Sequence, residues 1–317
     1  MILKALFERI PAVLCQGSWD TDIASIAMCS KEVTNNSLFI CIKGMEQDGH
    51  QYIQEAAERG AAACLVEEAF WKKSASVHGN LKQAEKKTSA YGELKLPEQM
   101  TIVSVQNTRE AAAWAAAAFY RYPSKELKVI GITGTKGKTT CAYMLRNIFE
   151  EAFGNKVGMI STVEATSCGR NIPKSGTTPE ALELYSILNE FVHDGVKAAC
   201  MEVSSQGLAY NRVDGIDFFV GAFLNLGEDH ISPTEHHSFE EYKAAKMRLM
   251  TLCRHGVVNI DDAAAPDFLN AATCETMTTI GIDSECDLRA CDVMQTKTGI
   301  DFTVRGKFFD GERFSLR

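Results

Sequence analysis

Short apolar runs alternate with helical patterns along the first third of the chain. Three near-continuous apolar runs predict buried strands, at residues 37–42, 61–66 and 101–105. Two stretches repeat apolar residues at helical spacing and predict helices, at residues 51–60 and 108–122. Alternating strands and helices are typical of an α/β domain, so we expect a small one over residues 1–106.

Two other stretches of this region have different patterns. The apolar positions of residues 1–15 have the spacing of an amphipathic helix. Residues 72–97 are rich in Lys, Ser, Gln and Gly and poor in apolar residues, which predicts a long exposed loop.

A second series of elements begins near residue 127. Residues 127–133 predict a strand, and residues 139–153 predict an amphipathic helix. Further near-continuous apolar strands follow, at residues 196–204, 217–226 and 256–260. Strands buried on both faces are typical of parallel sheets flanked by helices, so we expect a second α/β domain over residues 107–317 with a mostly parallel sheet. From about Met277 the apolar runs shorten and alternate, which we interpret as antiparallel hairpins at the sheet edge.

Composition narrows the functional classes. The chain has 317 residues, 45% of them apolar, which is enough for two packed domains. A net charge of -8 disfavours nucleic acid as a partner. Eleven cysteines without a CxxC pair indicate free thiols in a reducing compartment. Because no apolar run is long enough to cross a bilayer, we expect a cytoplasmic protein without membrane contact.

The predicted strand at 127–133 runs into GTKGKTT (134–140) and then into a helix. This is the context of a phosphate-binding P-loop: Gly134 and Gly137 let backbone N–H groups turn inward, and the helix N-terminus attracts an anion. Lys138 can reach the outer phosphates, and the Thr139 hydroxyl can bind Mg²⁺. The general pattern has Gly where this chain has Ile132, so a plain glycine turn is the alternative.

Several further motifs follow in order, and together with the P-loop they resemble the Mur ligase family of ATP-dependent amide-bond ligases. They are TTPE (177–180), MEVSS (201–205), NLGEDH (225–230) and EEYKAAKMRLM (240–250). Residues 37–53 and 60–68 are similar to the uridine-binding domain of the same ligases. Within the family, the chain resembles the type that adds the third residue of the cell-wall peptide to a UDP-linked precursor.

Glu202 and His230 each follow or end a predicted strand. Ligands gather at the carboxyl ends of parallel strands, so both side chains are expected near the P-loop. A carboxylate and an imidazole there suit Mg²⁺ between a nucleotide and a substrate carboxylate. A surface salt bridge for Glu202 and a helix-capping or core role for His230 are the structural alternatives.

The resemblance implies roles for further residues. Lys246 matches a lysine that the family carbamylates with carbon dioxide and uses, with Thr139, Glu202 and His230, to hold magnesium. The nucleotide-binding positions are Gly134, Thr135, Lys136, Gly137, Lys138, Thr139, Thr140 and Asn259. The positions for the UDP-muramoyl peptide are Ser30 and His50 at the uridine end, and Thr177, Thr178, Ser204 and Arg212. The Thr177-Thr178-Pro179 stretch is equally typical of a helix entry.

The resemblance also implies a reaction. A substrate carboxylate attacks the γ-phosphate of ATP, and an amino acid's amine then attacks the acyl phosphate. The expected substrates are UDP-MurNAc-L-Ala-D-Glu, ATP and an amino acid, with Mg²⁺ as cofactor and a monomer as the working form. The resemblance ends at Arg317, about where the family's amino-acid-binding C-terminal domain begins. We therefore expect that domain to be absent and this chain alone to be inactive.

Two other functions fit the sequence. One is a folylpolyglutamate-type ligase, which the segment ending in Asp48-Gly49-His50 disfavours. The other is a non-catalytic nucleotide-binding module. Among third residues, L-lysine is favoured over meso-diaminopimelate, because Gln206, Lys136 and the segment 229–242 resemble lysine-adding members.

Overall fold

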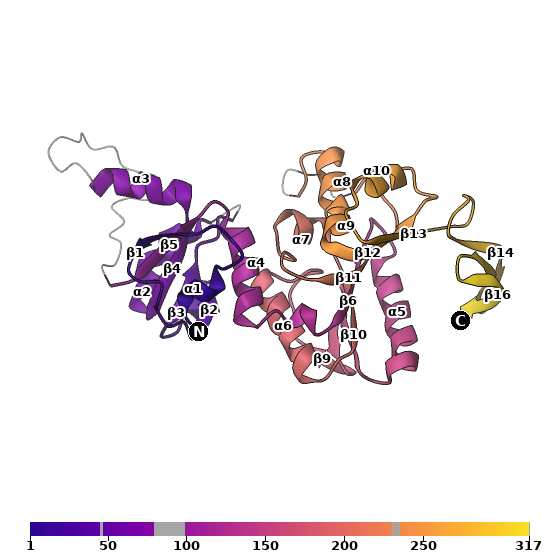
Figure 1. The fold of residues 1–317 in the computed structure, drawn as a ribbon, viewed down its shortest axis with the longest axis horizontal. Helices are drawn as coiled ribbons and strands as arrows, with labels where there is room; N and C mark the ends of the chain where they lie inside the picture. The colour runs from indigo at the N-terminus through magenta and orange to yellow at the C-terminus, as the bar shows by residue number, and fades with distance from the viewer. Residues whose placement is uncertain (45–46, 79–98, 230–231, 233–234, 317) are drawn as a thin grey trace. The chain divides into compact units, whose positions relative to one another are not determined.

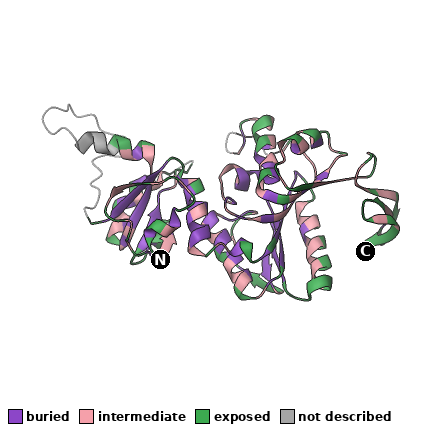
Figure 2. Ribbon diagram, viewed as in Figure 1, coloured by how far each residue is buried: buried purple, intermediate pink, exposed green. Residues whose placement is uncertain are grey.

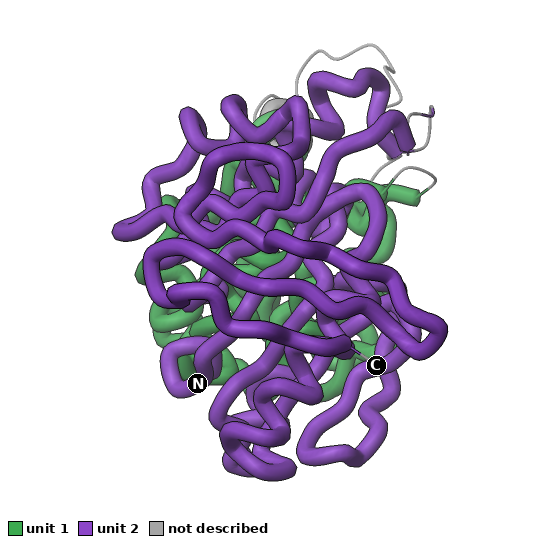
Figure 3. The backbone as a smooth tube through the Cα atoms, turned by 90° about the vertical axis from the view of Figure 1, so that its right-hand side faces the viewer, with its two compact units in different colours: residues 1–122, 181–186, 210–215 green, residues 123–180, 187–209, 216–317 purple. Residues whose placement is uncertain are grey.

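The computed structural model describes residues 1–44, 47–78, 99–229, 232 and 235–316, with the backbone alone for residues 74–78. The chain forms two compact units (Figure 3). The first comprises residues 1–122, 181–186 and 210–215, and the second comprises residues 123–180, 187–209 and 216–317.

The first unit is built on a five-stranded sheet in the order β1-β5-β4-β3-β2, as far as the described residues extend (Figure 1). Strands β2 to β5 run parallel, and β1 pairs antiparallel with β5. The strands are β1 (Val13–Gln16), β2 (Ser25–Ala27), β3 (Ser37–Ile40), β4 (Ala61–Glu67) and β5 (Thr101–Val105). The helices are α1 (Leu3–Leu6), α2 (Ile53–Glu58), α3 (Glu68–His78) and α4 (Thr108–Phe119), with 3₁₀ turns η1 (Ser30–Glu32) and η2 (Gly49–Tyr52).

Both faces of this sheet are buried. Along β3, Leu38 and Ile40 pack into one apolar cluster, while Phe39 and the following Cys41 pack into another. This alternation follows from the two-residue repeat of a strand and explains why the apolar run is continuous. Four alanines of α4 belong to the first cluster, namely Ala111, Ala112, Ala115 and Ala118, so this helix packs within the first unit. The boundary expected after residue 106 would have assigned α4 to the second unit.

Two predictions for this region differ from the structure. Residues 1–15 do not form one helix: α1 ends at Leu6, and β1 begins at Val13 after Pro11, because pairing with β5 satisfies its backbone. The prediction of a loop over residues 72–97 is wrong for residues 72–78, which continue α3. The side chain of Phe70 anchors α3 in the core, and a polar outer face is compatible with a helix. Residues 79–97 of the expected loop lie outside the described residues.

The second unit contains an eleven-stranded sheet within the described residues, in the order β16-β15-β14-β13-β12-β11-β6-β10-β7-β8-β9. The strands are β6 (Lys128–Thr133), β7 (Val157–Ile160), β8 (Ala165–Ser167), β9 (Arg170–Ile172), β10 (Ala198–Glu202), β11 (Phe218–Phe223), β12 (Cys253–Asn259), β13 (Thr276–Gly281), β14 (Leu288–Thr296), β15 (Gly299–Gly306) and β16 (Phe309–Leu316). The helices are α5 (Lys138–Phe153), α6 (Ala181–His193), α7 (Ser205–Ala209), α8 (Phe239–Met247), α9 (Leu249–Leu252) and α10 (Ala265–Ala271), with a 3₁₀ turn η3 (Pro123–Lys125). The start of α6, residues 181–186, is grouped with the first unit.

The centre of this sheet is parallel, as expected. Strand β6 lies between β10 and β11 and is parallel to both. Figure 2 shows these central strands as buried, while α5 is largely intermediate or exposed. Helix α5 packs on the sheet through Ala142, which clusters with Ile130, Ile132, Met159 and Cys200. This contact fixes the start of α5 at the carboxyl end of β6.

The prediction of antiparallel hairpins from Met277 onward is wrong for the first strand of that region. Strand β13 pairs in parallel with β12, and β14 begins in parallel with β13. Strands β14, β15 and β16 are antiparallel, as expected. An alternating pattern reports which face of a strand is buried and carries no information about strand direction, which explains the error.

Two expectations from composition can be compared with the structure. All eleven cysteines, each within the described residues, are free. Among the described helices, none is long and apolar enough to span a bilayer.

Candidate nucleotide-binding site

The P-loop joins the carboxyl end of β6 to the start of α5. Gly137 caps α5 with a φ of 83°, a left-handed conformation that favours glycine. A Cβ on Gly134 would lie 3.1 Å from the Cβ of Leu224 and 3.3 Å from the Asn225 nitrogen, so this position needs a small residue. The first N–H groups of a helix have no partner within it, so those of residues 137–140 can bind an anion.

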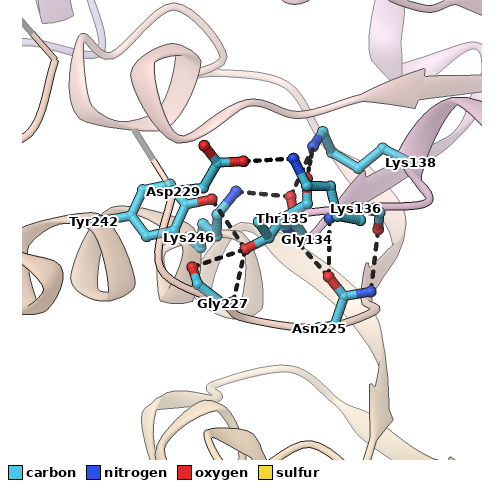
Figure 4. Close-up of polar contacts among 9 residues, drawn as sticks. All are labelled: Gly134, Thr135, Lys136, Lys138, Asn225, Gly227, Asp229, Tyr242 and Lys246. Carbon is cyan, nitrogen blue, oxygen red and sulfur yellow. Dashed lines mark hydrogen bonds and ion pairs between the residues drawn. The ribbon is translucent and has the colours of Figure 1, made fainter. Parts of the chain in front are cut away.

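Asn225, just beyond β11, fastens the loop to the neighbouring strand (Figure 4). Its Oδ1 accepts hydrogen bonds from the N–H groups of Thr135 at 3.1 Å and Lys136 at 2.9 Å. Its Nδ2 donates to the Lys136 carbonyl at 3.1 Å, and its own carbonyl accepts from the Thr135 N–H at 2.9 Å. The N–H groups of these two predicted nucleotide-binding residues are therefore used within the protein.

Two lysines converge on the carbonyl oxygen of Gly134. The Nζ of Lys138 donates to it at 2.8 Å and to the Thr135 carbonyl at 3.0 Å. The Nζ of Lys246, from α8, donates to the Gly134 carbonyl at 2.9 Å. The structure thus brings together the two lysines that the sequence analysis assigned to the site.

Lys246 is buried, with an exposed fraction of only 1%, and its Nζ lies 4.6 Å from the centroid of the Tyr242 ring. Burial, together with the nearby charge of Lys138, lowers the pKa of Lys246 to about 7, although Asp229 acts in the opposite direction. Burial also lowers the pKa of Lys138, while Glu202 opposes that shift. Burial thus favours the neutral amine of Lys246 over its ammonium form.

The side chain of Thr135 connects the P-loop to the segment after β11 and to α8. Its Oγ1 lies 3.1 Å from the Tyr242 hydroxyl and accepts from the Gly227 N–H at 2.9 Å. Lys136, which is 79% exposed, forms an ion pair with Asp229 at 2.7 Å. The loop conformation is thus held from both neighbouring segments.

Glu202, at the end of β10, is almost fully buried, and its carboxylate contacts the helix that follows the P-loop. The Thr139 hydroxyl donates to Oε1 at 2.8 Å. The Thr162 N–H donates to the same oxygen at 2.8 Å, and the Thr162 hydroxyl donates to Oε2 at 3.0 Å. Glu202 and Thr139, both predicted to bind magnesium, therefore lie side by side.

Three predicted substrate residues lie close to Glu202. The Thr178 hydroxyl donates to the Glu202 carbonyl at 3.0 Å and accepts from the Ser204 N–H at 2.9 Å. The Ser204 hydroxyl accepts from the Gly207 N–H at 3.0 Å, at the start of α7. Thr177 lies within hydrogen-bond distance of Thr162, at 3.1 Å. Thr177, Thr178 and Ser204 thus form one polar cluster around the end of β10.

Two predicted nucleotide-binding residues, Asn259 and Thr140, have no contact with this cluster among those described above. Asn259 ends β12 and donates from Nδ2 to the Leu224 carbonyl at 2.9 Å. Thr140 is exposed in the first turn of α5. His230 lies outside the described residues.

The predicted uridine-binding residues have internal partners in the first unit. His50 is 1% exposed, its Nδ1 lies 2.6 Å from Asp48 Oδ1, and its Nε2 accepts from the Glu67 N–H at 3.0 Å. Its ring stacks on Phe70 at 4.2 Å between centroids. The buried Ser30 hydroxyl donates to Glu55 at 2.9 Å. The observed contacts of both residues are structural.

Arg212 belongs to the part of the chain grouped with the first unit. Its guanidinium lies 5.7 Å from the centroid of the Tyr210 ring.

The donors around Glu202 fit a magnesium ion. Mg²⁺ prefers hard oxygen ligands and is often held by one or two carboxylates together with phosphate oxygens and water. The Glu202 carboxylate and the Thr139 hydroxyl supply such oxygens at the start of α5. No group of three His, Cys, Asp or Glu side chains with metal-binding geometry occurs among the residues with described positions.

Sequence reasoning missed Asn225, Asp229, Tyr242 and Thr162. The first three lie within the motifs NLGEDH (225–230) and EEYKAAKMRLM (240–250), in which the sequence analysis gave roles only to His230 and Lys246. Their position beside a glycine-rich loop at the end of parallel strands was the available signal. Thr162 follows β7 with no sequence signal of its own, and only the fold brings it to Glu202.

The fold and the loop define an α/β protein of the P-loop type. Residues 132–316 match the model of the Mur ligase middle domain, and residues 22–120 match that of the Mur ligase family catalytic domain. The chain belongs to the Mur ligase family.

Curated relatives support this assignment. The chain is 39% identical over 310 residues to UDP-N-acetylmuramoyl-L-alanyl-D-glutamate--2,6-diaminopimelate ligase 2 of Clostridium acetobutylicum, covering 97% of this chain and 59% of the relative. It is 35% identical over 311 residues to the corresponding ligase of Bacillus licheniformis, covering 95% and 57%. The chain thus spans less than two thirds of the length of these relatives.

Solved structures share the fold. A structure of a UDP-N-acetylmuramoyl-L-alanyl-D-glutamate--2,6-diaminopimelate ligase superposes with a TM-score of 0.74 at 19% identity, covering all of this chain and 59% of the other. The MurF ligase of Thermotoga maritima in complex with ADP gives a TM-score of 0.54 at 21% identity, covering 92% and 57%.

Proposed function

We propose that the chain provides the ATP site and part of the substrate site of a ligase that adds an amino acid to UDP-MurNAc-L-Ala-D-Glu in peptidoglycan precursor synthesis. The observation that carries this proposal is the convergence at the P-loop of Lys138, Lys246 and the Thr139–Glu202 pair. A phosphate cradle beside a buried carboxylate suits transfer of a phosphoryl group to a carboxylate substrate.

The proposed reaction has two steps. The substrate carboxylate attacks the γ-phosphorus of ATP, the bond to the bridging oxygen of ADP breaks, and an acyl phosphate forms. The amine of the amino acid then attacks the acyl carbon, loses a proton, and expels inorganic phosphate. The N–H groups of residues 137–140 and the Lys138 ammonium would hold the phosphoryl oxygens, so the protein acts mainly by positioning.

Magnesium, when bound, supplies positive charge between the nucleotide phosphates and the substrate carboxylate. Thr139 and Glu202 would hold it, with His230 as a further proposed ligand. The Glu202 carboxylate receives three hydrogen bonds from Thr139 and Thr162, which leaves acceptor capacity on a group that can accept about four.

Lys246 is the proposed site of carbamylation. Only a neutral amine can attack carbon dioxide, and a pKa of about 7 makes that form abundant at neutral pH. The attack forms an N–C bond and releases a proton, so a buried cation becomes an anion. Such an anion would face the Lys138 ammonium, which donates to the same Gly134 carbonyl as Lys246. Loss of activity in Lys246→Ala with partial rescue by a short carboxylate would support this modification.

For the UDP-muramoyl peptide, the proposed contacts are Thr177, Thr178 and Ser204 in the second unit and Arg212, Ser30 and His50 in the first. The polar cluster at the end of β10 supports the first three. The guanidinium of Arg212 is suited to a carboxylate or diphosphate because its donors form a fixed fork. The internal hydrogen bonds of His50 to Asp48 and to the Glu67 N–H set the orientation of its ring.

The identity of the amino acid stays a prediction. Gln206, Lys136 and the segment 229–242 favour L-lysine by kinship, whereas the relatives described above are named for 2,6-diaminopimelate. A competition assay with the full gene product at equal concentrations of the two amino acids distinguishes them.

The proposal is tested in two stages. Isothermal titration of the 317-residue chain with ATP should show binding that strengthens with Mg²⁺, and its absence would contradict the nucleotide site. Phosphate release by the full gene product, with UDP-MurNAc-L-Ala-D-Glu and each amino acid, tests the reaction. Release with a folate substrate and none with the UDP substrate would refute the proposed substrate.

A further inference from the structure

We propose that Thr162 is a positioning residue that orients Glu202 for the metal ion and couples it to the substrate cluster through Thr177. This inference rests on the proposed function, because it concerns the same carboxylate. Thr162 lies in the segment that follows β7, on the side of β10 opposite to β6.

Thr162 contacts both oxygens of the Glu202 carboxylate. Its N–H donates to Oε1 at 2.8 Å, and its hydroxyl donates to Oε2 at 3.0 Å. A carboxylate held at both oxygens by one residue cannot rotate freely about its last torsion, which is otherwise broad. Thr139 adds a third bond, to Oε1 at 2.8 Å. The plane of the carboxylate is thereby fixed relative to the start of α5.

The donor and the acceptor in the contact between the Thr162 and Thr177 hydroxyls can be assigned. An ionised carboxylate can only accept hydrogen bonds, so the single Thr162 proton points to Glu202. In the 3.1 Å contact between the Thr162 and Thr177 hydroxyls, Thr177 must then be the donor. The Thr177 oxygen is left as an acceptor, so the substrate group that it meets is an N–H or O–H donor.

Accessibility fits this role. Glu202 is 1% exposed, whereas the Thr162 side chain is exposed and Thr177 is half-buried. The Thr162 carbonyl also accepts from Lys174 at 3.3 Å, which ties the segment to the residues before Thr177. Thr162 therefore stands between a buried carboxylate and the surface at which a ligand arrives.

The test compares Thr162→Val with Thr162→Ser in the 317-residue chain. Valine keeps the branched shape and the backbone N–H bond to Oε1 but loses the hydroxyl, whereas serine keeps the hydroxyl. Thr251→Val is the matched control, because the Thr251 hydroxyl is also exposed and donates to a backbone carbonyl, that of Arg248, at 2.8 Å.

The measurement is Mn²⁺ binding by electron paramagnetic resonance with a saturating non-hydrolysable ATP analogue. Thr162→Val should weaken Mn²⁺ binding by about tenfold, the effect of losing one hydrogen bond to a charged group. Thr162→Ser and Thr251→Val should stay within about twofold of the parent, as expected when no such bond is lost. Nucleotide binding in EDTA should be the same in all four proteins.

Equal Mn²⁺ affinity in Thr162→Val and the parent would overturn the inference. So would an equal loss in Thr162→Ser, since the hydroxyl would then be irrelevant, or a loss in EDTA as well, which would indicate general damage. Failure of the parent to bind Mn²⁺ with the nucleotide would overturn the proposed metal site itself. Thermal unfolding of each variant confirms that the folded proteins are being compared.

Discussion

The two units place similar polar side chains beside parallel strands but use them differently. In the second unit, Glu202 and Lys246 are buried but do not use all their hydrogen-bonding capacity. The Glu202 carboxylate can accept about four hydrogen bonds and accepts three. The Lys246 ammonium has three donors and donates one hydrogen bond. In the first unit, both ring nitrogens of His50 have partners inside the fold. The observed contacts thus differ between the two units, and ligand binding by these residues stays a prediction.

The largest effect on ATP affinity is expected when Lys138 is replaced. Lys138→Ala removes the cation that faces the phosphate cradle, so ATP affinity of the 317-residue chain should fall by about 100-fold or more, as for a charge-assisted contact. Isothermal titration measures it. Lys156→Ala, an exposed lysine just before β7, is the control. ATP affinity in Lys138→Ala equal to that of the parent would refute the P-loop interpretation.

A second prediction concerns the effect of the buried Lys246 on the pH dependence of stability. Its folded-state pKa of about 7 lies below the unfolded value, so the unfolded chain binds more protons between these values and stability rises with pH in that range. Relative to Lys246→Met, the parent should gain about 2 kcal/mol in the free energy of unfolding between pH 7 and pH 9. Urea unfolding in carbonate-free buffers measures the difference. Parallel pH profiles for the two proteins would contradict the shifted pKa.

His50 tests the other side of the comparison. His50→Ala leaves the Glu67 N–H and the Asp48 carboxylate without their partner and removes the stacking on Phe70, so the free energy of unfolding should fall by about 2 kcal/mol. Uridine diphosphate affinity, measured where the variant is still folded, separates the two roles. Lost affinity at unchanged stability would support the predicted role of His50 as a direct ligand.

Asn225 tests how far the loop depends on its neighbour strand. Asn225→Ala removes two accepted bonds and one donated bond from residues 135 and 136, so ATP affinity should fall by about tenfold through a less ordered cradle. Asn270→Ala, on the exposed end of α10, is the control. The loop would be self-supporting if Asn225→Ala bound ATP as tightly as this control.

The smallest effect is expected at Lys136. Its side chain is 79% exposed and its ion pair with Asp229 is screened by solvent, so Lys136→Ala should change ATP affinity by less than about threefold. Titrations at low and high salt check this expectation. A large loss at both salt concentrations would make Lys136 a direct phosphate ligand.

The sequence by itself determined the strands, the helices and the loop that carry the site. Continuous apolar runs gave β3, β4, β5, β6, β10 and β11 because strands buried on both faces must be apolar throughout. GTKGKTT indicated the turn into α5 because glycine spacing and a lysine at a helix start have a local cause. The order of the motifs indicated the family.

Only the tertiary structure decided which side chains meet. The direction of β13, the bonds of Thr162 and Asn225 to residues far away in the sequence, and the internal partners of His50 depend on strand order and packing. Neither residue type nor spacing encodes these contacts, because parallel sheets connect segments through crossovers. Lys246 illustrates the difference: the sequence placed it on a helix, and burial against Gly134 and Tyr242 gave it a pKa of about 7.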